Sequence, residues 1–261
     1  MVLLAPGFRR ALPTLLLALA PVAGACTGER PRLADERDEP TTTTEPETTT
    51  TTTEPAPVGA EAAQAKAPSI DVFASEDAEA PDREIVSGVD TSVDTIPVVF
   101  LVKGKGADRL EVYLPVRPNG SSGWVNAGDV TVTSLPYRIE VGISAHRIRV
   151  FDGDEVIVDE PVGVGRTDRP TPGGVYYLKE LLQPPDPDGP YGTFAYGLSG
   201  FSNVLQSFNG GAGVIGIHGT NDPDAVGSDV SSGCIRLNND VIERLVNDVR
   251  LPLGTPVEIL A

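Results

Sequence analysis

The sequence predicts a mainly β protein with one C-terminal helix, preceded by a small β module and a long disordered segment. Three observations predict this class. Short runs of alternating apolar residues, separated by glycine, proline and asparagine, begin near Ile96 and recur along the rest of the chain. Helical spacing of apolar residues is clear at residues 240–249 alone, and a threonine- and glutamate-rich stretch precedes the strands.

The first residues have the pattern of an export signal. Two arginines precede an apolar run at residues 11–20, and small residues then lead to Cys26, which predicts a signal peptide at residues 1–25. Small residues before a cysteine resemble a bacterial lipobox, although Ala23 stands where that motif usually has a leucine-like residue. We therefore expect lipidation at Cys26 and a place on the outer face of the cytoplasmic membrane. Secretion to the cell wall and an uncleaved anchor are the alternatives.

Residues 26–91 are expected to form a disordered linker. Most of the formal net charge of -17 falls in this stretch, and residues 41–55 are almost entirely threonine, glutamate and proline. Such a composition cannot bury enough apolar surface to fold, so the segment is interpreted as a spacer. An acidic chain also excludes nucleic acid binding by counterion release, and anionic lipid would repel it. A membrane contact would therefore depend on the lipid anchor.

Residues 92–136 are expected to form a small β module. Apolar residues alternate from Ile96 to Val102 and again at residues 110–114, 124–125 and 130–132, with turn residues between the runs. The spacing resembles that of SH3-like modules.

Residues 137–261 are expected to form a second domain. Alternating strands flank Asp152-Gly153, a strong hairpin signal, and further strands are predicted at residues 174–178, 214–217 and 256–260. Residues 240–249 carry the apolar stripe of a helix, with Asp240 and Glu243 at the spacing of a capping box.

Few residues are available for chemistry. The chain has two cysteines and two histidines, too few for a Cys/His zinc site, and no cofactor is expected. In an exported protein a thiol without a disulfide partner is unusual, and Cys26 would carry lipid, so Cys234 is the candidate nucleophile. A thiol needs a nearby base to act at neutral pH. His218, which follows an apolar strand, is preferred to His146, which lies among exposed polar residues.

The spacing of 16 residues between His218 and Cys234 allows a loop to return the chain and bring the two side chains together. The turn before Cys234 would direct the N–H groups of Gly233 and Cys234 at a developing oxyanion. The carbonyl of Gly219 would orient the imidazole.

Two sequence motifs resemble the signature of the L,D-transpeptidase (YkuD-type) catalytic family: Ile217-His218-Gly219-Thr220 and Ser231-Ser232-Gly233-Cys234-Ile235-Arg236-Leu237. Residues 162–165 and 170–174 resemble the family's glycine turn and PTP-x-G element, and residues 198–202 resemble a substrate-groove segment. The resemblance covers residues 137–260 and implies a β-sandwich-like L,D-transpeptidase catalytic domain.

Position by position, the resemblance implies Cys234 as nucleophile, His218 as base and Gly219 as the orienting carbonyl. Gly233, Ser232 and Arg236 would support the oxyanion and the site. Arg236 would either hold the active-site loop through an ion pair or contact a substrate carboxylate. The family commonly has histidine where this chain has Ser232.

The resemblance also implies a function: cross-linking of peptidoglycan stem peptides, as donor and acceptor, through a cysteine thioester in cell-wall synthesis and cell shape. Inhibition by carbapenems would follow. An L,D-carboxypeptidase that hydrolyses the same thioester is the nearest alternative, and a non-catalytic wall-binding lipoprotein is the alternative from another class. Sortase-like and papain-like enzymes fit the order and spacing of His218 and Cys234 less well.

Overall fold

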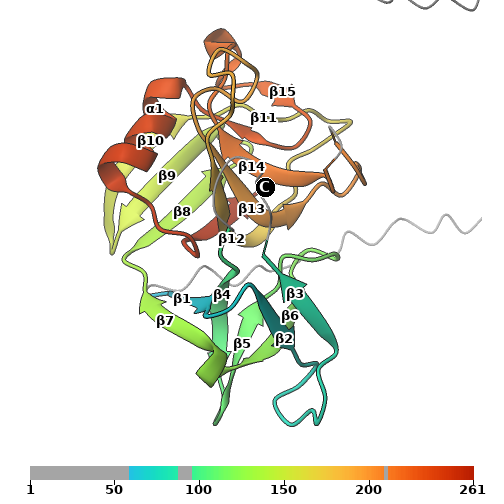
Figure 1. Ribbon diagram of the computed structural model, residues 1–261. Helices are drawn as coiled ribbons and strands as arrows, with labels where there is room; N and C mark the ends of the chain where they lie inside the picture. Colours follow the sequence, from blue (N-terminus) through green and yellow to red (C-terminus); the bar gives the residue numbers. More distant parts are fainter. Residues whose placement is uncertain (1–58, 88–95, 209–210) are drawn as a thin grey trace, which may run out of the picture. The chain divides into compact units, whose positions relative to one another are not determined.

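The structure is a computed structural model that describes residues 59–87, 96–208 and 211–261. The expected signal peptide at residues 1–25, the lipidation site Cys26 and linker residues 27–58 lie outside these ranges. Within them the chain is mainly β, as the sequence predicts, with one α-helix near the C-terminus (Figure 1). No helix in the described ranges is long and apolar enough to span a membrane.

The N-terminal strands form a five-stranded sheet and a separate two-stranded hairpin. The sheet has the order β6-β5-β4-β1-β7, and a short 3-10 helix, η1, precedes its last strand. Its elements are β1 (Glu61–Ala65), β4 (Val99–Lys105), β5 (Arg109–Tyr113), β6 (Ser122–Asn126), η1 (Ala127–Asp129) and β7 (Val130–Ser134). The hairpin consists of β2 (Ser69–Val72) and β3 (Arg83–Val86).

Three of these strands correct the expectation of a disordered linker at residues 26–91. β1, β2 and β3 lie inside that range, and β1 pairs with both β4 and β7, so it is an interior strand. Ala62 and Ala63 of β1 are buried. Alanine gives little hydrophobic contrast in a sequence, yet its small side chain packs closely between neighbouring strands. The module therefore begins before residue 92, while its likeness to SH3-like modules stays a prediction.

The C-terminal domain is built on an eight-stranded sheet with the order β10-β9-β8-β17-β12-β13-β14-β16. Most neighbours are antiparallel, but β17 pairs in parallel with β8, and β14 with β16. The strands are β8 (Tyr137–Gly142), β9 (Arg147–Asp152), β10 (Glu155–Pro161), β12 (Gly174–Leu182), β13 (Ala195–Phe201), β14 (Val214–His218), β16 (Ile235–Arg236) and β17 (Pro256–Leu260). A parallel pair of β11 (Val164–Gly165) and β15 (Asp229–Ser231) and a 3-10 helix, η2 (Pro223–Ala225), lie outside this sheet.

The predicted C-terminal helix is present, but its start differs from the capping-box expectation. α1 spans Asn239–Glu243 and continues as π-helical turns at Arg244–Val249. Asn238 is the N-cap and makes no side-chain cap hydrogen bond, so the expected box of Asp240 and Glu243 is wrong. Asp240 instead lies in the first turn, where a carboxylate interacts favourably with the helix dipole.

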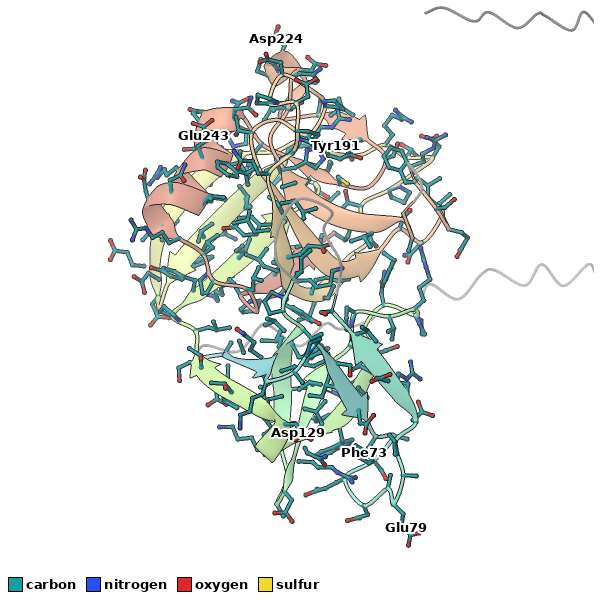
Figure 2. The ribbon with its side chains drawn as sticks, in the orientation of Figure 1. Phe73, Glu79, Asp129, Tyr191, Asp224 and Glu243 are labelled. Carbon is teal, nitrogen blue, oxygen red and sulfur yellow. The ribbon has the colours of Figure 1, made fainter. Side chains whose placement is uncertain are left out.

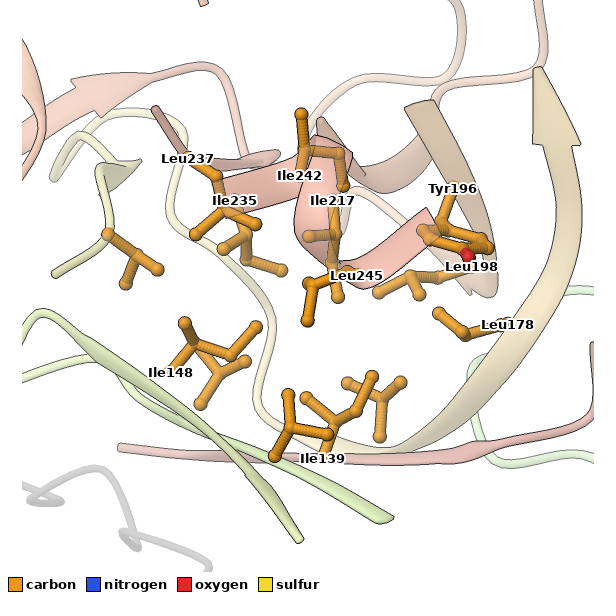
Figure 3. Close-up of a cluster of buried hydrophobic side chains, with 14 of the residues drawn as sticks. Ile139, Ile148, Leu178, Tyr196, Leu198, Ile217, Ile235, Leu237, Ile242 and Leu245 are labelled. Carbon is orange, nitrogen blue, oxygen red and sulfur yellow. The ribbon is translucent and has the colours of Figure 1, made fainter. Parts of the chain in front are cut away.

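The core of this domain lies between the sheet and the helix. Figure 3 shows Ile242 and Leu245 of the helical segment close to Ile217 and Tyr196 of the sheet, and all four are buried in one cluster. The apolar stripe of the helix and the strand β14 are therefore fixed against each other. This packing fixes the end of β14, where His218 lies.

Alternation along β12 gives Tyr177 a different environment from its neighbours. Tyr176 and Leu178 belong to the core beneath the helix, whereas Tyr177 packs with residues of the N-terminal module, Ala60, Ala62, Val99 and Leu101 among them. Successive side chains of a strand point to opposite faces, which explains the division. Tyr177 is fully buried and its hydroxyl has no hydrogen-bond partner among the described residues.

Tyr177→Phe is expected to leave the stability unchanged or to raise it by up to about 1 kcal/mol, because it removes an unpaired buried hydroxyl and keeps the ring. Burial holds the pKa of that hydroxyl well above its usual value, because the buried site disfavours the charged phenolate. Urea denaturation of both proteins measures the difference. A loss of more than about 1 kcal/mol would show that the hydroxyl has a partner, and Tyr177→Ala, which should lose about 3–5 kcal/mol, calibrates the ring's contribution.

Candidate active site

Cys234 and His218 are brought together by a short parallel pairing. In the register of β14 and β16, Ile217 lies beside Ile235 and His218 beside Arg236. Both isoleucines are fully buried in the core. Because side chains alternate along a strand, His218 and Cys234, each next to one of these isoleucines, are directed away from the core. The sequence prediction that a returning loop joins the two residues is therefore met by the fold.

His218 is held by one strong hydrogen bond. Its Nδ1 atom lies 2.6 Å from the carbonyl oxygen of Gly219, and a carbonyl only accepts, so Nδ1 carries the proton. The lone pair of the neutral ring is then on Nε2, the atom that can act as a base. The ring of Tyr191 stands edge-on to the imidazole, with 5.0 Å between the ring centroids. The structure thus places Gly219 where the sequence expected the orienting carbonyl.

Burial sets the protonation of both groups. The pKa of His218 is lowered to about 4, mainly because the imidazole is buried away from solvent. The hydrogen bond to Gly219 raises this pKa, and the charge of Arg236 lowers it. Loss of solvent raises the pKa of the Cys234 thiol, and a hydrogen bond with the Gly216 backbone and the charge of Arg236 offset part of that rise. At neutral pH the resting site therefore holds a neutral thiol and a neutral imidazole.

The low pKa of His218 makes the fold sensitive to acid. The unfolded chain binds a proton near the ordinary histidine pKa of about 6.5, whereas the folded chain binds it only near 4, so stability falls as pH drops between these values. Wild type should lose roughly 3 kcal/mol of unfolding free energy through this residue from pH 7 to pH 4, and His218→Gln should lose that much less. Denaturant unfolding at the two pH values measures both losses. Equal losses in the two proteins would contradict the pKa shift.

The turn before Cys234 is fixed by Ser231. Its hydroxyl donates to the carbonyl of Cys234 at 2.6 Å and accepts the N–H of Gly233 at 3.0 Å. This corrects the expectation that Gly233 offers its N–H to an oxyanion, because that N–H already has an acceptor. Of the two expected donors, the Cys234 N–H remains. Ser232, the other expected supporting residue, accepts a long hydrogen bond of 3.4 Å from Arg169.

Arg236 lies beside the catalytic candidates without an ion pair. Its backbone N–H and carbonyl both bond to Gly163. Among the described residues its side chain forms no salt bridge, and its buried Nε has no hydrogen-bond partner. An ion pair that holds the loop, one of the two expected roles, is therefore absent from the part of the chain that the structure describes. The Nε–H group of the Arg236 guanidinium is therefore available to donate a hydrogen bond to a ligand.

Two hollows meet at the thiol and the imidazole. A small cavity of about 90 Å³ and an open groove of about 1510 Å³ are both lined by Cys234 and His218. The residues that the two hollows also share are Tyr191, Phe208, Gly213, Val214 and Ile215. The two hollows are therefore continuous with each other at the thiol and the imidazole.

Several residues of the site were missed from the sequence. One of them is Tyr191, which lies between β12 and β13 and contacts the ring of His218 (Figure 2). The glycine and proline before it indicate a turn in the sequence but do not indicate a role in the site. Asn239 accepts the N–H of Thr220 at 3.0 Å and so holds the turn after His218. A Cβ atom at Gly192 would lie 2.1 Å from Asn239 Oδ1 and 2.6 Å from Gly219 Cα, so this glycine permits the close approach.

Other expected residues lie elsewhere. Residues 198–202 were expected to form part of a substrate groove, but residues 198–201 belong to β13, where Leu198 is in the core and Ser199 is buried. Ser202 alone of this segment lines the small cavity beside Cys234. His146 pairs with Asp229 at 2.8 Å and does not line either hollow. Cys234 is a free cysteine, and the described residues contain no cluster of three His, Cys, Asp or Glu side chains that could hold a metal.

A thiol and an imidazole line the same hollows, and the other imidazole nitrogen is held by a carbonyl. These are the groups that enzymes with a cysteine nucleophile use. Residues 136–259 match the family described as the L,D-transpeptidase catalytic domain (YkuD). The chain belongs to this family, because it is also 31% identical over 156 residues to a relative, and the alignment covers 85% of that relative. That relative bears the name L,D-transpeptidase YkuD, comes from Bacillus licheniformis and aligns with 57% of this chain.

Two further similar proteins were found. A protein of the same name from Bacillus subtilis is 34% identical over 126 residues, which cover 48% of this chain and 67% of the relative. Among solved structures, that of L,D-transpeptidase LdtMt1 in complex with imipenem is 18% identical, covers 63% of this chain and 90% of its own, and has a TM-score of 0.40.

Proposed function

We propose that this chain is an L,D-transpeptidase that cross-links peptidoglycan stem peptides, with Cys234 as the nucleophile and His218 as its base. The observation that carries the proposal is the meeting of two hollows at a thiol and an imidazole that are adjacent in the fold. Transfer between two peptides needs room for a donor and an acceptor at one sulfur, and the groove of about 1510 Å³ beside the small cavity supports this. Membership of the L,D-transpeptidase family supplies the substrate class.

The first half of the reaction forms a thioester. A stem peptide binds with the carbonyl of its third, diamino residue next to Cys234. His218 Nε2 takes the thiol proton as sulfur attacks that carbonyl, and the N–H of Cys234 donates to the oxyanion. The bond to the terminal D-alanine breaks, and its amine leaves with the proton that His218 returns. The neutral resting pair limits wasteful thiolate formation, so proton transfer accompanies attack.

The second half resolves the thioester. An amine from a neighbouring stem attacks the acyl carbon, His218 accepts its proton and passes it to the departing sulfur, and sulfur leaves as the thiol. The thioester retains the energy of the broken amide, so no nucleotide is needed outside the cell. The buried guanidinium of Arg236, which has an unpartnered Nε, is suited to a carboxylate of the stem peptide. By the same chemistry, carbapenems would acylate Cys234.

The remaining expectations concern the place of the enzyme. We propose export by residues 1–25 and lipidation at Cys26, which would hold the domain on the outer face of the cytoplasmic membrane and within reach of the wall. Metabolic labelling with a fatty acid tests this point. Labelling that survives Cys26→Ser, or its absence from wild type, would contradict the anchor.

The test of the reaction is intact-protein mass spectrometry of the protein from residue 59 onward after incubation with a disaccharide tetrapeptide. An acyl adduct together with a cross-linked dimer of stems in solution is the expected result. An adduct with tripeptide as the sole product would favour the carboxypeptidase. A verified free thiol that gives no adduct with peptide or carbapenem would favour the non-catalytic wall-binding protein.

A further inference from the structure

One wall of the site is a segment with little packing of its own. Residues 201–208 and 211–213, here called the wall segment, join β13 to β14, and Ser202, Leu205, Phe208 and Gly213 line the small cavity beside Cys234. Val204 is 52% exposed and Phe208 is 42% exposed. Because these apolar side chains bury little area, hydrophobic packing contributes little to the shape of the segment.

Arg117 of the N-terminal module bonds to this segment at three points. Its Nη1 donates to the Ser202 carbonyl at 2.8 Å, and its Nη2 donates to the carbonyls of Leu205 at 2.9 Å and Ala212 at 3.1 Å. The guanidinium also lies over the ring of Phe201, 4.8 Å from its centroid. Hydrogen bonds from a charged donor are stronger than neutral ones, and here one side chain joins both ends of the segment.

Asn119 holds the start of the segment. Its Nδ2 donates to the Phe201 carbonyl at 2.8 Å, and its Oδ1 accepts the Phe201 N–H at 2.9 Å. A side-chain amide thus occupies both hydrogen-bonding groups of one residue, as a neighbouring strand would. The end of β13 is thereby fixed to the module.

The segment is also tight at the point where Arg117 reaches it. Gly213 has a φ of +69°, and a Cβ atom there would lie 2.4 Å from the Leu205 carbonyl oxygen and 3.3 Å from Arg117 Nη2. The N–H of Ser202 donates to the Gly213 carbonyl at 2.9 Å. The segment therefore closes on itself around the guanidinium, and β14, which carries His218, begins at the next residue.

We propose that Arg117 and Asn119 are positioning residues for the active site: the N-terminal module holds the wall segment in the shape that receives the stem peptide. This inference rests on the proposed function for its substrate. It assigns the module a part in substrate fit, since neither residue lines the hollows at Cys234. The chemistry of the thiol itself does not depend on them.

The test compares Arg117→Met and Asn119→Leu, which keep the side-chain size and remove the hydrogen bonds, with Arg83→Met as a matched control. Arg83 is an exposed module arginine whose ion pair is with its neighbour Asp82. For the two test variants the KM for the tetrapeptide should rise at least about tenfold with little change in kcat, because several charge-assisted or paired hydrogen bonds are lost. Alkylation of Cys234 by iodoacetamide, which needs no groove, should stay within about twofold of wild type. Arg117→Lys should restore part of the KM.

Hydrogen exchange separates this inference from the proposed function. In Arg117→Met, amides of residues 201–208 should exchange at least about tenfold faster, whereas those of β8 and β17 should not change. If exchange is faster but the protein is never acylated by the peptide, the positioning role of Arg117 is supported and only the proposed substrate is contradicted. Unchanged exchange, or an unchanged KM, or alkylation that falls in proportion to peptide turnover, would overturn the positioning role.

Discussion

Cys234→Ala is expected to abolish acyl transfer, with a loss of roughly 10⁴-fold or more, because the alternative of direct attack by amine or water lacks the covalent step. Cys234 is the free cysteine of the described residues and lies where both hollows meet. No adduct should form with the tetrapeptide or with a carbapenem. Intact mass and quantified cross-linked product together measure the loss.

Two controls make this result specific to the thiol. The side chain of Cys234 is partly exposed, so its truncation should change the free energy of unfolding by less than about 1 kcal/mol. Cys234→Ser keeps a nucleophilic atom in place, but an imidazole with a pKa of about 4 is a weak base for a hydroxyl, so this variant should also be nearly inactive. Cross-linking by a folded Cys234→Ala protein would disprove the thioester route and direct attention to the wall-binding alternative.

The two catalytic candidates were predictable from the sequence because local signals placed them. Cys234 is a thiol without a disulfide partner, His218 follows an apolar strand, and both lie in short motifs that resemble the family signature. The last strand was predicted at residues 256–260 and lies there, at Pro256–Leu260. Signals that depend on neighbours in the chain were therefore sufficient for these elements.

The parts that sequence reasoning missed depend on distant contacts. β1 is an alanine-rich interior strand whose partners lie tens of residues away, and its pattern alone resembles that of a linker. The bonds from Arg117 reach residues 85 to 95 positions further along the chain. Tyr191 contacts His218 only because a loop returns it to the site. The residues next to these positions in the sequence do not indicate such contacts, so the contacts are seen only in the folded chain.

His218→Gln is expected to lower peptide acylation by about 10²–10⁴-fold, the contribution of a positioned general base. Glutamine is the suitable replacement, because its amide can still donate to the Gly219 carbonyl while it cannot accept the thiol proton at neutral pH. Since burial raises the pKa of the Cys234 thiol, little thiolate forms without the base. His146→Gln, which removes a histidine paired with Asp229 outside both hollows, is the matched control and should keep the wild-type rate.

The pH profile gives the sharper test of this pair. In wild type the imidazole stays unprotonated down to about its pKa of 4, so the step limited by the base should change little above about pH 5 and fall only as pH approaches that value. In His218→Gln, thiolate must form by itself, and the rate should climb about tenfold per pH unit toward the raised pKa of the thiol. Acylation and iodoacetamide alkylation, followed between about pH 5 and pH 9 in both proteins, measure the two profiles. A wild-type rate that falls with an apparent pKa near or above the ordinary histidine value of about 6.5 would contradict the lowered pKa of His218. It would show instead that loss of solvent in the folded protein does not disfavour protonation of the thiol–imidazole pair.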